Sequence, residues 1–279
     1  MKIIGSVYEH DAIFRYLDLY VHDIGELERV LQMYPEEDKV VYWMMVNNIT
    51  GVVFNVEEIG SLCHKYGAYY IMDAVAAIGH YPISNNLESF CDCLITSAHK
   101  YGGPQGTGCI WISDRFSKFI GLSNDSHEEF GLIHGTPNVS AAVAMSLAMR
   151  HAVREAKTNN IVWGQLVNYM CTKLLENGIL HHIQDIENTN KTYAINALYL
   201  PNINGDALVQ YLSSKSIYIS PGHSACSNDA VESSRVLEAF GLTKEQASQT
   251  VRISFGENTS EVDIDALVDG IVEFKNLFI

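Results

Sequence analysis

Apolar and polar residues follow two rhythms along the first half of the chain. Residues 40–46 form an unbroken apolar run that is typical of a buried strand. Further short apolar runs predict strands at 68–72, 93–96 and 108–113. Amphipathic helical patterns separate these runs, so we expect a mainly parallel sheet that helices cover on both faces.

Two helices have clear starting signals. Asp23, followed three residues later by Glu26, has the pattern of a capping box. Asn55 is placed to cap the next helix, with Glu58 three residues later, and Gly67 is placed to end that helix.

The pattern changes after Pro137. The later elements are expected to be helices at 141–156, 162–177, 205–213 and from Ser260 onward, and strands at 193–200, 216–220 and 251–255. We therefore predict a large α/β domain at residues 1–137 and a smaller α+β domain at residues 138–279.

Composition narrows the class of protein. The 279 residues are 47% hydrophobic, which is enough for a packed core. The formal net charge of −15 argues against direct binding of nucleic acid or of an anionic membrane, and simple solubility explains it better than a basic partner does. The longest apolar run, 40–46, is far shorter than the ~20 residues of a membrane span. No charged segment with a following apolar stretch opens the chain, so we expect a cytoplasmic protein.

The six cysteines show no paired framework and no CxxC motif, as in a reducing compartment. Cys91 and Cys93 are separated by one residue and should face the same side of a strand. A metal pair is conceivable there, but ordinary strand residues are the favoured interpretation. We expect no metal site.

Two residues at strand ends suggest a cofactor. Asp73 directly follows the strand at 68–72, and Lys100 follows the strand at 93–96 in the glycine-rich sequence SAHKYGGPQGTG. Ligands of parallel sheets bind beyond the carboxyl ends of the strands. Pyridoxal 5′-phosphate (PLP) needs a lysine for its aldehyde and an acid for its pyridinium nitrogen. Ser97 and His99 could contact its phosphate, although Lys100 alone could be a solvated turn lysine.

These motifs resemble a known family. The order S-x-H-K-x-x-G-P-x-G-x-G after M-D-A-x-x-x-x-G is similar to the class V aminotransferase group of fold-type I PLP enzymes, and within it to cysteine desulfurases of the NifS/IscS type. The resemblance runs from about Ile3 to Phe274. It implies a PLP-dependent transferase of fold type I, with a mainly parallel large domain and a smaller α+β domain.

The resemblance also assigns roles to the cofactor site. Lys100 corresponds to the Schiff-base lysine, Asp73 to the partner of the pyridinium nitrogen, and Ser97 and His99 to phosphate contacts. In the same way, His10 of Glu9-His10 would stack on the ring and move protons, although alone it could be a capping or surface histidine.

The remaining assignments concern the substrate and the subunit partner. Asn48 corresponds to an asparagine at the cofactor's phenolic oxygen and the substrate, and Arg252 to the arginine that binds the substrate carboxylate. Thr136, after Gly135, corresponds to a residue that reaches the phosphate of the opposite subunit. Taken singly, Asn48 and Thr136 could be turn residues, and Arg252 a surface salt-bridge residue.

Cys226 corresponds to the nucleophile of the S-A-C-(T/S) loop. By itself it could be a small buried hydrophobe, but its polar neighbours at 222–229 favour an exposed loop. The resemblance then implies a cysteine desulfurase: L-cysteine displaces Lys100 from PLP, the Cys226 thiolate attacks the substrate sulfur, alanine leaves, and Cys226 holds a persulfide for a protein acceptor.

Other functions stay open at this point. A selenocysteine lyase or an aminotransferase would share the fold, and a non-catalytic scaffold of a sulfur-transfer complex is a further alternative. The acceptor could serve iron–sulfur cluster assembly, tRNA thiolation or DNA phosphorothioation.

The sequence also departs from the family. Relatives carry a segment before Glu-His with a Gly-Thr-Glu-Ala turn that grips the phosphate, and nothing similar appears before Glu9. A partner chain or an unusual homodimer could replace it, and we favour these over a degenerate product. Ala76 stands where a glutamine is usual, which removes a hydrogen bond worth ~1 kcal/mol. Ile133 and His134 replace a usual Arg-Ser pair.

Overall fold

The computed structural model describes residues 1–84, 86–122, 129–133, 135–184, 190–222 and 230–279, with only the backbone course for 230–234. The chain divides into two compact units. Unit 1 comprises Met1–Val46 and Phe54–Ala156, and unit 2 comprises Asn47–Val53 and Lys157–Ile279. In the described residues, no helix is long and apolar enough to cross a membrane.

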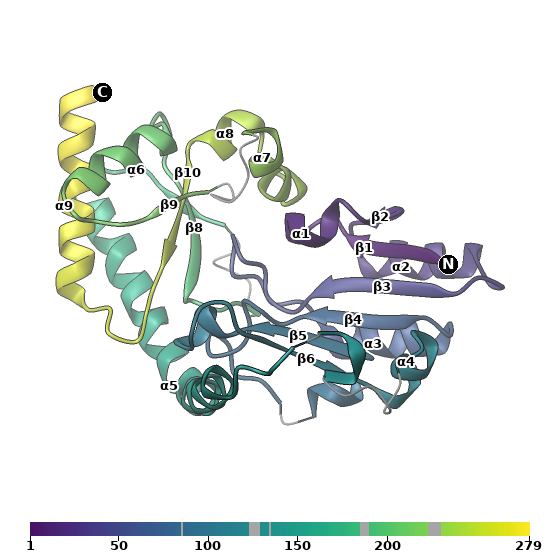
Figure 1. Cartoon of the computed structure of the whole chain (residues 1–279). Coiled ribbons are helices and arrows are strands. Elements are labelled where there is room, and N and C mark those ends of the chain that lie inside the picture. Colours follow the sequence, from purple (N-terminus) through teal and green to yellow (C-terminus); the bar gives the residue numbers. More distant parts are fainter. Residues whose placement is uncertain (85, 123–128, 134, 185–189, 223–229) are drawn as a thin grey trace. The chain divides into compact units, whose positions relative to one another are not determined.

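Unit 1 is built on a sheet of six strands (Figure 1). In sheet order the strands are β2 (Leu19–Val21), β1 (Lys2–Ser6), β3 (Lys39–Met44), β4 (Tyr69–Asp73), β5 (Cys93–Ser97) and β6 (Gly108–Ile112). All neighbouring strands pair in parallel except β6, which is antiparallel to β5. The mainly parallel sheet predicted from the apolar runs is therefore confirmed.

Short helices follow the strands of unit 1. They are α1 (Asp11–Phe14), α2 (Ile24–Met33), α3 (Val56–Lys65) and α4 (Asp114–Phe119), with 3₁₀ turns η1 (Leu87–Ser89), η2 (Ala98–Tyr101) and η3 (Glu129–Gly131). The predicted caps are present: the Asp23 and Asn55 side chains accept from the amides of Glu26 and Glu58. The Glu26 carboxylate reaches the amide of His22, not that of Asp23, so the capping box is shifted by one residue.

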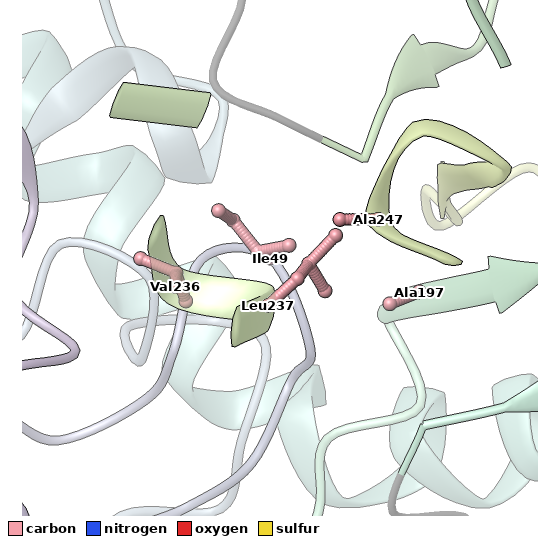
Figure 2. Close-up of a cluster of buried hydrophobic side chains, with 5 residues drawn as sticks. All are labelled: Ile49, Ala197, Val236, Leu237 and Ala247. Atoms are coloured by element: carbon pink, nitrogen blue, oxygen red, sulfur yellow. The ribbon is translucent and has the colours of Figure 1, made fainter. Parts of the chain in front are cut away.

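Unit 2 contains an antiparallel sheet of four strands. In sheet order these are β7 (His182–Ile183), β8 (Ile195–Tyr199), β10 (Thr250–Ser254) and β9 (Ser220–Pro221), and the helices are α6 (Gly205–Ser214), α7 (Ala230–Ala239), α8 (Lys244–Ser248) and α9 (Glu261–Phe278). Figure 2 shows one part of its core, in which Ile49 packs with Ala197, Val236, Leu237 and Ala247. The strand predicted at 216–220 is wrong in extent, because only Ser220 and Pro221 pair with β10.

A single helix replaces the two predicted at 141–156 and 162–177. Helix α5 (Val139–Glu176) is continuous over 38 residues. The linking residues 157–161 include two asparagines, which are weak helix formers, but contain neither glycine nor proline, so no residue breaks the helix. The compact units divide within this helix, after Ala156. The domain boundary at Pro137 stays a prediction.

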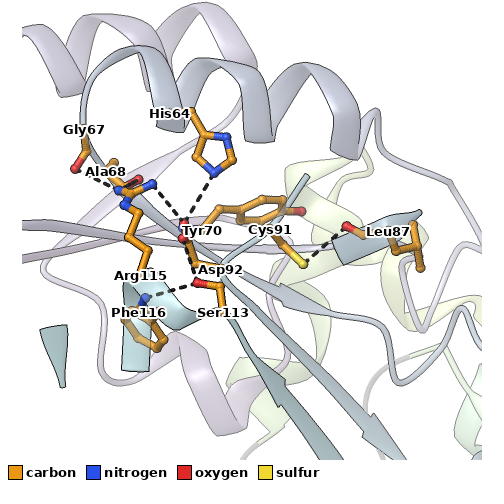
Figure 3. Close-up of polar contacts among 10 residues, drawn as sticks. All are labelled: His64, Gly67, Ala68, Tyr70, Leu87, Cys91, Asp92, Ser113, Arg115 and Phe116. Carbon is orange, nitrogen blue, oxygen red and sulfur yellow. Dashed lines mark hydrogen bonds and ion pairs between the residues drawn. The ribbon is translucent and has the colours of Figure 1, made fainter. Parts of the chain in front are cut away.

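A buried carboxylate fastens the amino-terminal ends of β4 and β5 (Figure 3). Asp92 lies just before β5 and is 2% exposed. Its oxygens accept from the Tyr70 amide at 3.0 Å and the Ser113 hydroxyl at 3.2 Å. Arg115 and His64 approach it at 3.5 and 3.6 Å. Because several donors converge on it, the buried charge is compensated inside unit 1.

We expect Asp92→Asn to lower the free energy of unfolding by about 2–3 kcal/mol, because it removes the charge that Arg115 and the backbone amide compensate. Urea unfolding followed by circular dichroism measures the loss. The control Asp114→Asn changes an exposed aspartate in the first turn of α4 and should cost less than about 1 kcal/mol. Equal losses for the two variants would contradict this account.

Candidate active site

The carboxyl ends of the parallel strands carry the predicted cofactor residues. β1 ends at Ser6, shortly before His10, β4 ends at Asp73, and Lys100 follows β5. Since parallel strands end at one edge of the sheet, the three side chains reach the same region of unit 1 from distant parts of the sequence. The charges of His10 and Lys100 both act on the Asp73 carboxyl, so the three groups lie near one another.

Asp73 is the centre of this group. Its Oδ1 accepts from the amide of Val75 at 2.8 Å, and no other hydrogen bond to its carboxylate is made by the described residues. Burial raises the pKa of the Asp73 carboxyl, whereas the Val75 amide and the charges of His10 and Lys100 lower it. The chain thus holds a carboxylate in a poorly solvated place beside two potential cations.

Lys100 lies in the turn η2, and its side chain is exposed. Gly102 ends the turn at φ +83°, a conformation that favours glycine. The amide of Gly103 then donates to the Ala98 carbonyl at 2.8 Å, and a Cβ at Gly103 would lie 2.9 Å from the Ala98 Cβ. The two glycines therefore fold the turn tightly and leave the Lys100 amine accessible.

His10 is both a helix cap and a neighbour of Asp73. Its Nδ1 accepts from the Ala12 amide at 3.1 Å at the start of α1. The neutral ring therefore carries its proton on Nε2, which can act as a donor. Glu9 beside it is fully buried, and its Oε1 accepts from the Ser6 hydroxyl at 2.6 Å and the Met44 amide at 2.8 Å. These bonds join the ends of β1 and β3 and fix the backbone from which His10 projects.

Ser97, His99 and Thr136, the residues predicted to bind phosphate, all lie among the described residues. Ser97 Oγ and His99 Nδ1 form a hydrogen bond of 2.9 Å with each other. Thr136 is exposed. The predicted nucleophile Cys226, and His134 of the altered Arg-Ser position, lie outside the described residues.

The predicted substrate residues meet in unit 2. Arg252, on β10, donates from Nη1 to the Asn48 carbonyl at 3.0 Å and from Nη2 to the Ser220 hydroxyl at 3.2 Å. The Asn48 side-chain oxygen is buried and has no hydrogen-bond partner among the described residues. A buried amide end without a partner is costly in a folded protein and is a common sign of a bound polar group.

These observations test whether the residues suit PLP. Unit 1 offers an accessible amine on Lys100 and, on Asp73, a carboxylate with an unused oxygen. These are the partners that an aldehyde and a protonated ring nitrogen require, so the residues of unit 1 fit the cofactor.

Two further residues were not foreseen. His80 is partly buried, and burial lowers the pKa of its imidazole, with a further lowering by Lys100. Ser220 supports Arg252 from β9. Neither His80 nor Ser220 belongs to a motif, so the sequence gives no signal for either residue.

The cysteines of the described residues differ from a nucleophile. Burial raises the pKa of Cys91 and Cys93 to about 12, and it also raises the pKa of Cys63, Cys109 and Cys171. These thiols stay protonated near neutral pH and are therefore poor nucleophiles. No cluster of three or more potential metal ligands occurs in the part of the chain that the structure describes.

Asp73→Asn should stabilise the cofactor-free chain at neutral pH. The folded carboxyl has a raised pKa, so the folded state binds more protons than the unfolded state between the two pKa values. Stability therefore falls as the pH rises through the folded pKa, and the variant, whose amide oxygen can still accept from Val75, avoids this loss. Thermal unfolding at pH 7 and at about pH 3.5 should show an advantage that vanishes at the lower pH. A destabilised variant at pH 7 would contradict this prediction.

Comparison with known proteins identifies the family of the chain. Residues 12–267 match the family described as aminotransferase class-V. A probable mitochondrial cysteine desulfurase of Dictyostelium discoideum is 29% identical over 96% of this chain and 61% of its own length. The cysteine desulfurase IscS of Shewanella sp. strain ANA-3 is 31% identical over 97% of this chain and 69% of its own length. The chain thus spans less than two thirds of the Dictyostelium relative.

Solved structures share the fold. A NifS-like protein of Rickettsia africae superposes with a TM-score of 0.81 at 24% identity, over 99% of this chain and 76% of that one. Another structure described as a NifS-like protein gives a TM-score of 0.82 at 27% identity, over 99% of this chain and 75% of that one. The predicted α/β fold is confirmed, and the chain belongs to the class V aminotransferase family, with cysteine desulfurases among its relatives.

Proposed function

We propose that the chain is a PLP-dependent cysteine desulfurase that converts L-cysteine to L-alanine and passes the sulfur to a protein acceptor. The observation that carries this proposal is the grouping of Lys100, Asp73 and His10 at the carboxyl edge of the unit 1 sheet. The family typically binds PLP, and its cysteine desulfurases are about 30% identical to this chain.

The residues of unit 1 would hold the cofactor. Lys100 would bind it covalently through its amine, Asp73 would accept the ring N–H, and Ser97 and His99 would contact its phosphate. When bound, PLP withdraws electrons from the substrate and so makes its α- and β-carbons reactive. The buried position of Asp73 strengthens its interaction with a cationic ring, because few water molecules compete for the carboxylate.

Proton transfer falls to two residues. The amine of Lys100 would carry the α-proton of the substrate, and the exposed side chain leaves it room to move. His10 can donate from Nε2 while Nδ1 remains bound to the Ala12 amide. The cap thereby fixes the tautomer of the ring.

Unit 2 would recognise the substrate and its sulfur. The guanidinium of Arg252 would bind the carboxylate of cysteine, with the Asn48 amide beside it. The thiolate of Cys226 would attack the substrate sulfur: the S–S bond forms, the Cβ–S bond breaks, and its electron pair stays with the carbon fragment, which is released as alanine after protonation. Among the cysteines, Cys226 takes this role because burial disfavours the thiolate of the five described ones.

The proposal includes a homodimer. Thr136 is exposed, as a residue that serves the opposite subunit must be. Apolar side chains flank it: Leu132, Val139, Val143 and Leu147 are 50–66% exposed. The last three recur every four residues along α5 and form one stripe, which a second copy would cover.

Cys226→Ala should abolish sulfur transfer to an added thiol, with a loss of at least about a hundredfold, because the persulfide has no other site on which to form. The measurement is alanine and sulfide released from L-cysteine in the presence of dithiothreitol. Cys171→Ala, which removes a half-buried thiol on α5, is the matched control and should keep full activity. Undiminished release by Cys226→Ala, or amino-group transfer to a keto acid in place of alanine formation, would refute the proposal.

Val143→Lys should convert the dimer to a monomer, because the charge lies within the apolar stripe of α5. Sedimentation velocity gives the mass. The control Ala144→Lys adds the same charge at a neighbouring exposed position on a different side of the helix, and it should leave the dimer intact. A Val143→Lys chain with the same mass as the parent would exclude this interface.

A further inference from the structure

The segment that carries Asn48 belongs to unit 2 but interrupts unit 1 in the sequence. Residues 47–53 belong to unit 2, although the residues on both sides of them belong to unit 1. Ile49, next to Asn48, is 2% exposed and packs against Ala197 and Leu237 in the core shown in Figure 2. The position of Asn48 is therefore set by contacts with unit 2.

Backbone hydrogen bonds fasten the segment to residues 190–192. The amide of Val53 donates to the Asn190 carbonyl, and the amide of Thr192 donates to the Gly51 carbonyl, both at 2.9 Å. Val52 and Lys191 form an isolated antiparallel bridge. Gly51 has φ +77°, and a Cβ there would lie 2.7 Å from the Thr192 carbonyl oxygen. Only a glycine allows this close approach without displacing the chain.

Lys191 adds a charged contact at the centre of this junction. Its side chain is 1% exposed, and its ammonium donates to the carbonyl of Thr50 in the segment and to that of Gln184 at 3.1 Å. Burying an ammonium is expensive, so the bonds it makes must be well formed. The lysine thus joins the 47–53 segment to the chain around Gln184.

The contact at Thr50 is transmitted to Asn48 through a tight turn. The side-chain oxygen of Asn47 accepts from the amides of Ile49 and Thr50, at 3.0 and 2.9 Å, and from the Thr50 hydroxyl at 3.1 Å. These bonds join residues 47–50 into one turn. The Asn48 carbonyl in the same turn accepts from Arg252.

We infer that Lys191 is a positioning residue for substrate recognition: it holds the 47–53 segment so that Asn48 stays bound to Arg252. This inference rests on the proposed function, in which these two residues bind the carboxylate of the amino acid. Lys191 itself touches neither substrate nor cofactor. Its loss therefore weakens substrate binding and leaves the chemical step on unit 1 intact.

The test compares Lys191→Met, which keeps the length of the side chain without its charge, with Lys215→Met as a matched control. Lys215 is a partly exposed lysine of unit 2 that pairs with Glu273. Hydrogen–deuterium exchange should be about tenfold or more faster for the peptide covering 47–53 in Lys191→Met, since a lost charged hydrogen bond is worth roughly that factor. In Lys215→Met this exchange should be unchanged.

Steady-state kinetics give the second readout. In Lys191→Met the KM for L-cysteine should rise about tenfold, while kcat changes little, because a binding contact is lost and the reacting groups are kept. Gly51→Ala opens the same junction from the other side and should reproduce both effects, which keeps the test decisive if Lys191→Met does not fold.

The outcomes separate the inference from the proposed function. The positioning role of Lys191 is overturned if exchange of the 47–53 peptide is unchanged in Lys191→Met and in Gly51→Ala. It is also overturned if this exchange is faster but the KM for L-cysteine is unchanged. A parent chain that holds PLP but releases no alanine from cysteine overturns the proposed function. In that case the exchange data still decide whether Lys191 holds the segment.

Discussion

The parallel alignment of the strands is the constraint on which the site depends. Because β1, β4 and β5 run in the same direction, the residues after their last positions gather at one edge, and His10, Asp73 and Lys100 meet there from widely separated positions. The opposite edge of the sheet, where the strands begin, contributes to stability. There Asp92 binds the backbone and side chains that hold the strand starts together. One edge of the sheet thus contributes stability and the other offers chemistry.

Unit 2 contributes a second arrangement whose parts come from three distant places. Asn48 lies within the sequence of unit 1, Ser220 on β9 and Arg252 on β10. The buried Lys191 and the turn around Asn47 determine where Asn48 lies. The residues proposed to recognise the substrate are therefore positioned by the packing of unit 2, whereas Lys100, Asp73 and His10 are positioned by the sheet of unit 1.

The sequence predicts those parts of the structure that local chemistry decides. The caps Asp23 and Asn55, the strands of unit 1 and the glycine-rich turn at Lys100 all follow from short-range patterns, and each is confirmed. The prediction of two helices in place of α5 was wrong, because the weak helix formers at 157–161 resemble a linker when packing is unknown.

Residues whose role comes from tertiary contacts give no local signal. Lys191 stands in a polar stretch that suggests a solvated lysine, yet it is buried against the Thr50 carbonyl, 141 residues away in sequence. Asp92 lies between two cysteines that attract attention first, although it is the aspartate that joins the strand ends. Hydrogen bonds between distant residues decide both cases, and these cannot be inferred from one sequence.

Asp92, Lys191 and Asp73 differ in how their charges are compensated. Asp92 has charged and backbone donors on several sides, and Lys191 donates to two carbonyls. Asp73 accepts one backbone hydrogen bond from the described residues, and burial keeps the pKa of its carboxyl raised. Perturbed carboxyl groups cluster at functional sites, and the single hydrogen bond to Asp73 leaves its carboxylate able to accept from a ligand. In the proposed function the cationic ring nitrogen of PLP would supply the donor, so the geometry of Asp73 supports the proposal independently of the motif around Lys100.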